Sequence, residues 1–224
     1  LFSMFQSRVI EKGAWYSGIP KTFRRYFLSW TSGYFILHIF VPITFYLEGP
    51  EEAGKLGLLL NIVKAATNLA STCIDSCLPS LNKLAASRKH EEFGILYKKR
   101  SILAIFLYVT VIFMIIVAAM VFADTVIVLE RFPSTIVIIF MLFSELGYLI
   151  NLLFAKYLRA YLIEAYHKLS LFMACIIPFL VYFGLNINSV ESMSKLLCAF
   201  YLFCVVPVSF SIFRKEIKFI LRTN

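Results

Sequence analysis

The sequence predicts an all-α, polytopic membrane protein built as a bundle of six transmembrane helices. Three observations lead to this fold class. First, 60% of the 224 residues are hydrophobic and only 16% are charged, whereas a soluble domain carries about 25% charged residues. Second, six apolar runs approach the roughly 20 residues that a helix needs to cross a bilayer. Third, the basic residues gather in short blocks between these runs.

The chain divides into three parts. Residues 1–25 mix apolar and basic residues and predict a cytoplasmic linker that lies on the lipid headgroups. Residues 26–213 form the six-helix lobe, and residues 214–224 form a basic cytoplasmic tail. Because the chain begins at Leu1 and shows no signal-peptide pattern, we expect it to be a fragment of a longer membrane protein. The spans are expected at about 26–47, 55–83, 101–123, 133–155, 169–184 and 193–213.

Each of the first three spans has a recognisable feature. The first carries Trp30 and Tyr34 as aromatic anchors, and Pro42 should kink it in its outer third. The second continues past Pro79 into an amphipathic stretch, residues 80–100, on the cytoplasmic side. The third is almost purely aliphatic and aromatic, which is typical of a helix that faces lipid. A tight acidic turn is expected between the first two.

The last three spans show fewer distinctive polar residues. The fourth opens at Pro133, a residue that is favoured at a helix start, and carries Glu145 near its middle. The fifth and sixth are joined by an uncharged outer turn with Asn186 and Asn188. The sixth runs into the basic tail.

The placement of positive charge predicts the orientation. If the spans alternate in direction, all but four of the 22 Lys and Arg residues lie on one side. The exceptions are Lys55, Arg131 and Lys195 on the other side and Lys64 within a span. Because basic residues accumulate in cytoplasmic loops, both ends of this multi-pass chain should be cytoplasmic. The net charge of +9 is too sparse for a nucleic-acid surface and falls in short blocks between the apolar runs, so no nucleic-acid partner is expected.

The second span is the unusual one, because polar residues recur along it at spacings of three and four. These residues are Asn61, Lys64, Asn68, Ser71 and Asp75. Such spacing puts them on one face of a helix. Lys64 and Asp75 are separated by about 16 Å along the axis, so they cannot pair with each other. Each therefore needs a partner from another helix, and the stripe should face protein or a water-filled cavity, because a lysine in hydrocarbon costs about 3 kcal/mol.

Two roles remain open for these charges. In the first role, Lys64 attracts an anionic substrate head group. Together with Asn61, Asn68 and Ser71 beside it, Lys64 forms the predicted substrate-binding site. Asp75 and Glu145 then take part in ion coupling or gating. In the second role, Lys64 and Glu145 form an ion pair that holds the second span to the fourth.

Other polar residues gave weaker signals. His38 lies in the first span and is either a packing residue or a further coupling group. The five cysteines fall inside apolar runs without metal or disulfide spacing, and are best interpreted as packing residues. We find no nucleophile elbow, phosphate loop, metal-ligand pair or dinucleotide fingerprint. The sequence thus predicts neither an enzyme nor a cofactor.

One stretch carries a family resemblance. It is LSWTSGYFILHIFVPITFYLEGPEEAGKLGLLLNIVKAATNLAST, followed by PSLNKLAASRKHEEF. Its features are a Gly-Pro acidic turn, glycines at Gly54 and Gly57, a polar helix, and Pro79 before a small-residue, basic helix. This pattern resembles the C-terminal half of a bacterial polysaccharide or O-antigen flippase, within the multidrug, oligosaccharidyl-lipid and polysaccharide exporter superfamily.

The resemblance implies a function and partners. Such proteins move an undecaprenyl diphosphate-linked oligosaccharide across the bacterial inner membrane during lipopolysaccharide and other cell-surface polysaccharide synthesis, and use a cationic cavity between two six-helix lobes. This chain would be one lobe, in contact with membrane lipids, the lipid-linked oligosaccharide and a missing N-terminal lobe. The alternatives are a cation-coupled drug exporter of the same superfamily, an intramembrane enzyme of envelope polysaccharide assembly, and a passive assembly subunit.

Overall fold

The computed structural model describes residues 23, 26–36, 38–121 and 132–222, and the described residues are mostly helical, with no strand. Six helices are long and apolar enough to cross a membrane, as the sequence predicts. The first covers Tyr26–Glu48 and ends as α2. The remaining elements are α3 (Pro50–Asp75), α4 (Leu78–Ala86), α5 (His90–Val121), α6 (Thr135–Ala160), α7 (His167–Asn188), α8 (Val190–Ala199), η2 (Phe200–Val205) and α9 (Val206–Arg222).

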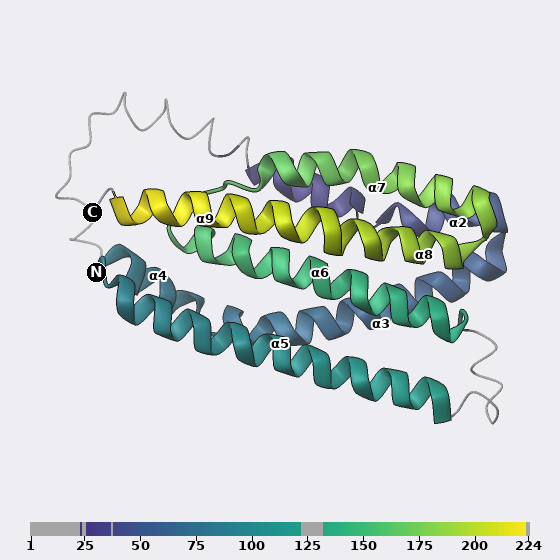
Figure 1. The fold of residues 1–224 in the computed structure, drawn as a ribbon, viewed down its shortest axis with the longest axis horizontal. Coiled ribbons are helices and arrows are strands. Elements are labelled where there is room, and N and C mark those ends of the chain that lie inside the picture. Colours follow the sequence, from purple (N-terminus) through teal and green to yellow (C-terminus); the bar gives the residue numbers. More distant parts are fainter. Residues whose placement is uncertain (1–22, 24–25, 37, 122–131, 223–224) are drawn as a thin grey trace.

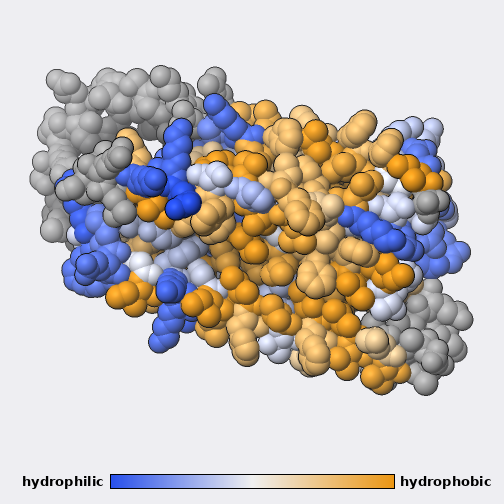
Figure 2. Space-filling model, viewed as in Figure 1, coloured by the Kyte–Doolittle hydropathy of each residue, from blue (hydrophilic) through white to orange (hydrophobic). Residues whose placement is uncertain are grey.

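The helices lie roughly alongside one another in an elongated bundle (Figure 1). The turn at Gly49 and the turn between α7 and α8 lie at one end, which we term the Gly49 end. The opposite end carries α4 and the end of α9, and is termed the α4 end. In Figure 2 a band of apolar surface separates hydrophilic surface at the two ends. That distribution is what a bilayer-spanning protein requires, and the chain is a polytopic membrane protein.

Helix α6 is central and α5 is peripheral. Half of the apolar stretch of α6 is buried inside the protein, against 17% for α5. Side chains such as Ile102, Phe106 and Phe113 of α5 are exposed. The lipid-facing character predicted for the third span therefore agrees with the position of α5.

Two predicted boundaries differ from the structure. The third span was expected to begin at residue 101, but α5 begins at His90. Lys98, Lys99 and Arg100 end the apolar run without ending the helix, because charged residues are good helix formers. The second span was expected to pass through Pro79 as one helix, but α3 ends at Asp75 and α4 starts afresh at Leu78, with Pro79 in its first turn.

Proline and π-helical turns shape two of the spans. The helical pattern of the first span is interrupted at Ile39, since Pro42 cannot donate to the carbonyl of His38. The span stays one helix from Tyr26 to Glu48 with a bend at Ile39, which agrees with the kink predicted near Pro42. In the sixth span, the wide π-helical turn η2 puts Tyr201 against Gly147 of α6, where an added Cβ would lie 3.0 Å from that of Tyr201.

The backbones of α7 and α8 approach each other closely at Gly184. A Cβ at Gly184 would lie 2.5 Å from the backbone Cα of Met193. Replacing Gly184 with alanine should therefore push α7 and α8 apart and lower stability by about 1–3 kcal/mol. Thermal unfolding of the purified protein in lipid nanodiscs measures this as a lower midpoint.

The matched control is Gly94→Ala in α5, where nothing lies within 4 Å of the added Cβ. Alanine is the better helix former, so this change should be neutral or stabilising by up to about 1 kcal/mol. Equal midpoints for the two variants would contradict the packing that we describe.

Candidate functional site

The polar stripe of α3 divides between an exposed face and a face that contacts α6. Asn61, Asn68 and Asp75 are exposed, Lys64 is partly buried and Ser71 is buried. The Ser71 hydroxyl donates to the Asn68 carbonyl at 3.1 Å and to Asp75 Oδ2 at 3.2 Å. The stripe predicted from spacing is therefore real, but its members do not all have the same surroundings.

Both charges of α3 meet an opposite charge on α6. Lys156 Nζ lies 2.6 Å from Asp75 Oδ1. Lys64 interacts electrostatically with Glu145, and Glu145 Oε1 also accepts a hydrogen bond of 3.1 Å from the Thr67 hydroxyl. The expectation of a partner on another helix is confirmed for Asp75, and Glu145, which interacts with Lys64, lies on the same helix as Lys156.

The two pairs match because the two helices carry the same spacing. Lys64 and Asp75 are eleven residues apart, and so are Glu145 and Lys156, with the signs reversed. In Figure 1, α3 and α6 both run from the Gly49 end to the α4 end. Eleven residues make three turns plus about 20°, or about 16 Å, so parallel helices bring both pairs into register.

Glu145 lies in a largely aromatic environment. Tyr108 of α5, Tyr148 of α6 and Tyr201 of η2 are near enough to interact with it electrostatically. The Tyr108 hydroxyl donates to the Leu142 carbonyl at 3.1 Å. A carboxylate among tyrosine rings, with a single threonine hydroxyl and a lysine beside it, is an ionisable group in a poorly solvated site.

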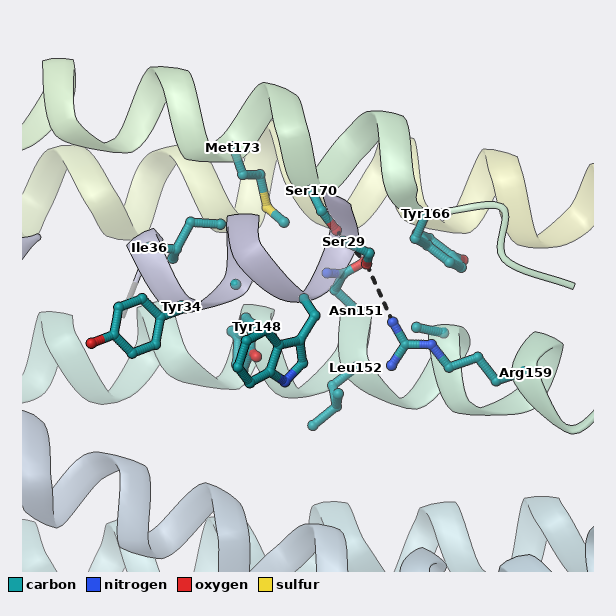
Figure 3. A pocket seen from close by; sticks show the side chains of 13 residues that line it. Ser29, Tyr34, Ile36, Tyr148, Asn151, Leu152, Arg159, Tyr166, Ser170 and Met173 are labelled. Carbon is teal, nitrogen blue, oxygen red and sulfur yellow. Dashed lines mark hydrogen bonds between the residues drawn. The ribbon is translucent and has the colours of Figure 1, made fainter. Parts of the chain in front are cut away.

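A cavity of about 280 Å³ lies between residues 26–36, α6 and α7 (Figure 3). We term it the Arg159 cavity. Its lining contains aromatic rings and polar groups, among them Ser29, Trp30, Tyr34, Tyr148, Asn151, Arg159 and Ser170. Figure 3 shows residues 26–36 and α3 on opposite sides of α6, so α6 contributes both to this cavity and to the ion pairs with α3.

The end of α6 positions the charged group of the cavity. Leu162 has a left-handed backbone (φ 61°), and Ile163 N–H donates to the Leu158 carbonyl at 3.0 Å, which together form a Schellman cap. The chain thereby turns back, and buried Glu164 accepts hydrogen bonds from Arg159 Nε at 2.8 Å and Nη2 at 3.2 Å. Arg159 Nη2 also donates to the Ser29 hydroxyl at 3.4 Å.

His38, the remaining predicted site residue, and Asn151 of α6 lie apart from the ion pairs. His38 is exposed, with its ring centroid 4.4 Å from that of Tyr34 on the first span. Asn151 is buried, and its Oδ1 accepts a hydrogen bond of 2.7 Å from Ser209 of α9. Within the described residues, no group of three or more His, Cys, Asp or Glu side chains could hold a metal ion.

Several residues of the site were not indicated by the sequence pattern. Lys156 and Arg159 were assigned to a basic cytoplasmic loop, yet they belong to the last turns of α6. The equal spacing of Lys64 to Asp75 and of Glu145 to Lys156 was the signal that could have revealed the pairing. Thr67 and Glu164 offered no comparable pattern.

The Asp75–Lys156 pair should show energetic coupling. Asp75→Lys and Lys156→Asp each place like charges together and should lower the free energy of unfolding, while the double swap restores an attractive pair. We expect a coupling energy of about 0.5–3 kcal/mol, because the Lys156 side chain is 14% exposed. The measurement is thermal unfolding of the four proteins in nanodiscs.

The surface pair Lys89–Glu92 is the control, since its side chains are 56% and 58% exposed. Its swap cycle should give only about 0.2–1 kcal/mol. Additive effects of the two substitutions at Asp75 and Lys156 would mean that the pair does not hold α3 to α6.

Comparison with protein-family models, with characterised proteins and with solved structures gives no match to this chain. The fold and the geometry of the site are therefore what a functional proposal has to build on.

Proposed function

We propose that this chain is one six-helix lobe of a bacterial transporter that flips a lipid-linked oligosaccharide across the cytoplasmic membrane. The observation that carries the proposal is the meeting of opposite charges between α3 and α6, where Lys64 interacts electrostatically with Glu145 and Asp75 pairs with Lys156, beside the exposed amides Asn61 and Asn68. Ionisable groups inside a membrane are costly, and they mark the paths of polar substrates and ions.

The exposed face of α3 supports a second wall opposite it. Apart from Pro50 and Leu69, its exposed positions recur every three or four residues, and comprise Glu51, Gly54, Leu58, Asn61, Ala65, Asn68, Thr72 and Asp75. Beyond the first turn, Asn61, Asn68, Thr72 and Asp75 form the polar part of this face. A row of amides, a hydroxyl and a carboxylate is unfavourable against lipid. In our proposal this row faces an aqueous path shared with a second lobe, and the two lobes rock about it to expose the substrate to either side.

Lys64 and Glu145 supply binding and coupling in this proposal. An anionic diphosphate that approaches Lys64 competes with Glu145 for the ammonium group. A proton taken up by Glu145 would remove that competition and leave Lys64 for the substrate. Asp75, hydrogen-bonded to Ser71 and paired with Lys156, occupies the same face nearer the α4 end and can act as a gate. His38, near the middle of the first span, is a further coupling group in this proposal.

Removing the charge of Lys64 tests the proposal directly. In proteoliposomes that contain the chain with its second lobe, Lys64→Gln should slow the flipping of an undecaprenyl diphosphate-linked saccharide by about tenfold or more, equivalent to about 1.4 kcal/mol of lost attraction. The midpoint of thermal unfolding should fall, because Glu145 loses the charge beside it, but the variant should remain folded at the temperature of the assay. Flipping is measured as loss of accessibility of the labelled sugar to a reagent outside the vesicle.

Lys83→Gln is the matched control, because Lys83 is an exposed lysine of α4. It should flip substrate at the normal rate. If Lys64→Gln instead gives no folded protein, the interaction of Lys64 with Glu145 serves to hold α3 to α6. A cationic dye moved faster than the lipid-linked sugar would favour the drug exporter.

The proposed orientation places the α4 end in the cytoplasm. The described residues of that end include the basic residues Lys83, Arg88, Lys89, Lys168, Arg214, Lys215 and Lys218. The Gly49 end carries Glu48, Glu51, Glu52 and Glu191, with Lys55 and Lys195. Such asymmetry of Lys and Arg favours a cytoplasmic α4 end.

Cysteine labelling measures the orientation. In a background without the five native cysteines, Glu51→Cys should react with a membrane-impermeant maleimide in intact cells. Ser87→Cys, in the turn after α4, should react only after permeabilisation. The reverse pattern would place Lys64 and Asp75 in the opposite order along the transport path and overturn the proposed gating end.

A further inference from the structure

We propose that the Arg159 cavity is a binding site for one uncharged sugar ring, separate from the head-group site on α3. The assignment of that ring to a lipid-linked substrate rests on the proposed function, whereas the capacity of the cavity to hold a sugar does not. Three properties of the cavity carry the inference, namely its size, its charge and its aromatic wall.

The size fits a single ring. The volume of about 280 Å³ lies just below the range of about 300–1,000 Å³ that is usual for ligand pockets. At about 30 Å³ per water molecule it would hold about nine waters, which is comparable with one monosaccharide of about a dozen heavy atoms. An oligosaccharide would have to extend beyond it.

The charge favours a neutral ligand over a phosphate. Glu164 takes hydrogen bonds from two nitrogens of Arg159, so the positive charge of the guanidinium is already compensated. Among the described residues, the hydrogen bonds of Arg159 use Nε and Nη2, which leaves the two N–H donors of Nη1 for a ligand. A compensated guanidinium donates hydrogen bonds to hydroxyl groups without selecting an anion.

Hydroxyl and amide groups surround this donor. Ser29 and Ser170 lie 3.5 Å apart through their hydroxyl oxygens, and both line the cavity. Asn151 accepts from Ser209 through its Oδ1, so its amide NH₂ can donate elsewhere. Figure 3 shows Ser29, Asn151 and Arg159 close to one another at one end of the cavity. This is a set of donors and acceptors that suits sugar hydroxyls.

Aromatic rings form the other wall. Trp30 and Tyr34 follow one another on the first span with ring centroids 6.5 Å apart and an angle of 25° between their planes. They line the cavity and are also 74% and 55% exposed. The His38 ring centroid lies 4.4 Å from that of Tyr34, so Trp30 offers the more open face and Tyr34 extends the aromatic wall. The face of an aromatic ring is electron-rich and attracts weakly positive C–H groups, which the flat side of a pyranose presents.

Trp30 also provides the measurement. The chain has two tryptophans, Trp15 and Trp30, so Trp15→Phe leaves Trp30 as the sole reporter. The chain is placed in nanodiscs of phosphatidylethanolamine and phosphatidylglycerol, free of sugar-based detergent. Glucose, galactose and N-acetylglucosamine are each titrated, and Trp30 emission is followed. We expect a saturable change with at least one sugar, at millimolar concentration, and none with sorbitol, an open-chain polyol.

Three variants locate the binding. Tyr34→Leu removes an aromatic face and should weaken binding about tenfold, whereas Tyr34→Phe keeps the ring and should bind normally. Tyr46→Leu is the control, since Tyr46 is an 84% exposed tyrosine of the same span that does not line the cavity. Thermal unfolding shows that each variant is folded.

Two further titrations separate the alternatives. Octyl glucoside, used below its micellar concentration, should bind more tightly than glucose if the natural ligand is a sugar attached to a lipid. If the natural ligand is a free sugar, octyl glucoside and glucose should bind equally tightly. Pyrophosphate should leave Trp30 emission unchanged, and tighter binding of pyrophosphate than of every sugar would overturn the inference, as would the absence of any response to sugar. If the protein binds sugar but does not flip the lipid-linked saccharide, the sugar site stands and the flippase proposal is wrong. If it flips the saccharide but does not bind sugar in the cavity, the flippase proposal stands and the sugar site is wrong.

Discussion

The structure depends on the compensation of charges that sequence alone would place in hydrocarbon. Lys64 and Asp75 are tolerated in α3 because α6 offers Glu145 and Lys156 at the same spacing with reversed sign. A buried charge without a partner would cost several kcal/mol. The central position of α6, with half of its apolar stretch buried, follows from this requirement, because the helix that carries the compensating charges has to lie inside the bundle.

The fold class and the spans were predictable because hydropathy reports directly on what a bilayer accepts. Helix ends were less predictable. A bilayer ends an apolar run but does not end a helix, so Lys98, Lys99 and Arg100 continue α5 beyond the apolar stretch. Pro79 marked a true boundary, and the separate helix α4 begins just before it, since proline is well accommodated in a first turn.

Only those features of the candidate site that depend on a single helix could be predicted from the sequence. Periodicity identified the stripe on α3 and the need for partners, because both are properties of a single helix. The identity of the partners depends on which helices lie side by side, and spacing on α3 says nothing about this. The Arg159 cavity was missed for the same reason: Ser29, Asn151 and Ser170 come from three spans, and Glu164 reaches Arg159 only because the chain reverses at Leu162.

The matched charges have a mechanical consequence. Two attachment points about 16 Å apart fix both the height and the rotation of α3 against α6, and a slip by one helical turn of about 5.4 Å would separate both pairs at once. Helices α3 and α6 should therefore move together as one rigid body. The Ser29 hydroxyl of residues 26–36 lies 3.4 Å from Arg159 Nη2 and 3.5 Å from the Ser170 hydroxyl, and Tyr26 adds an electrostatic interaction with Arg159. These hydrogen bonds are longer than the 2.6 Å pair of Asp75 with Lys156, so any opening of the bundle should begin by swinging this segment away from α3 and α6.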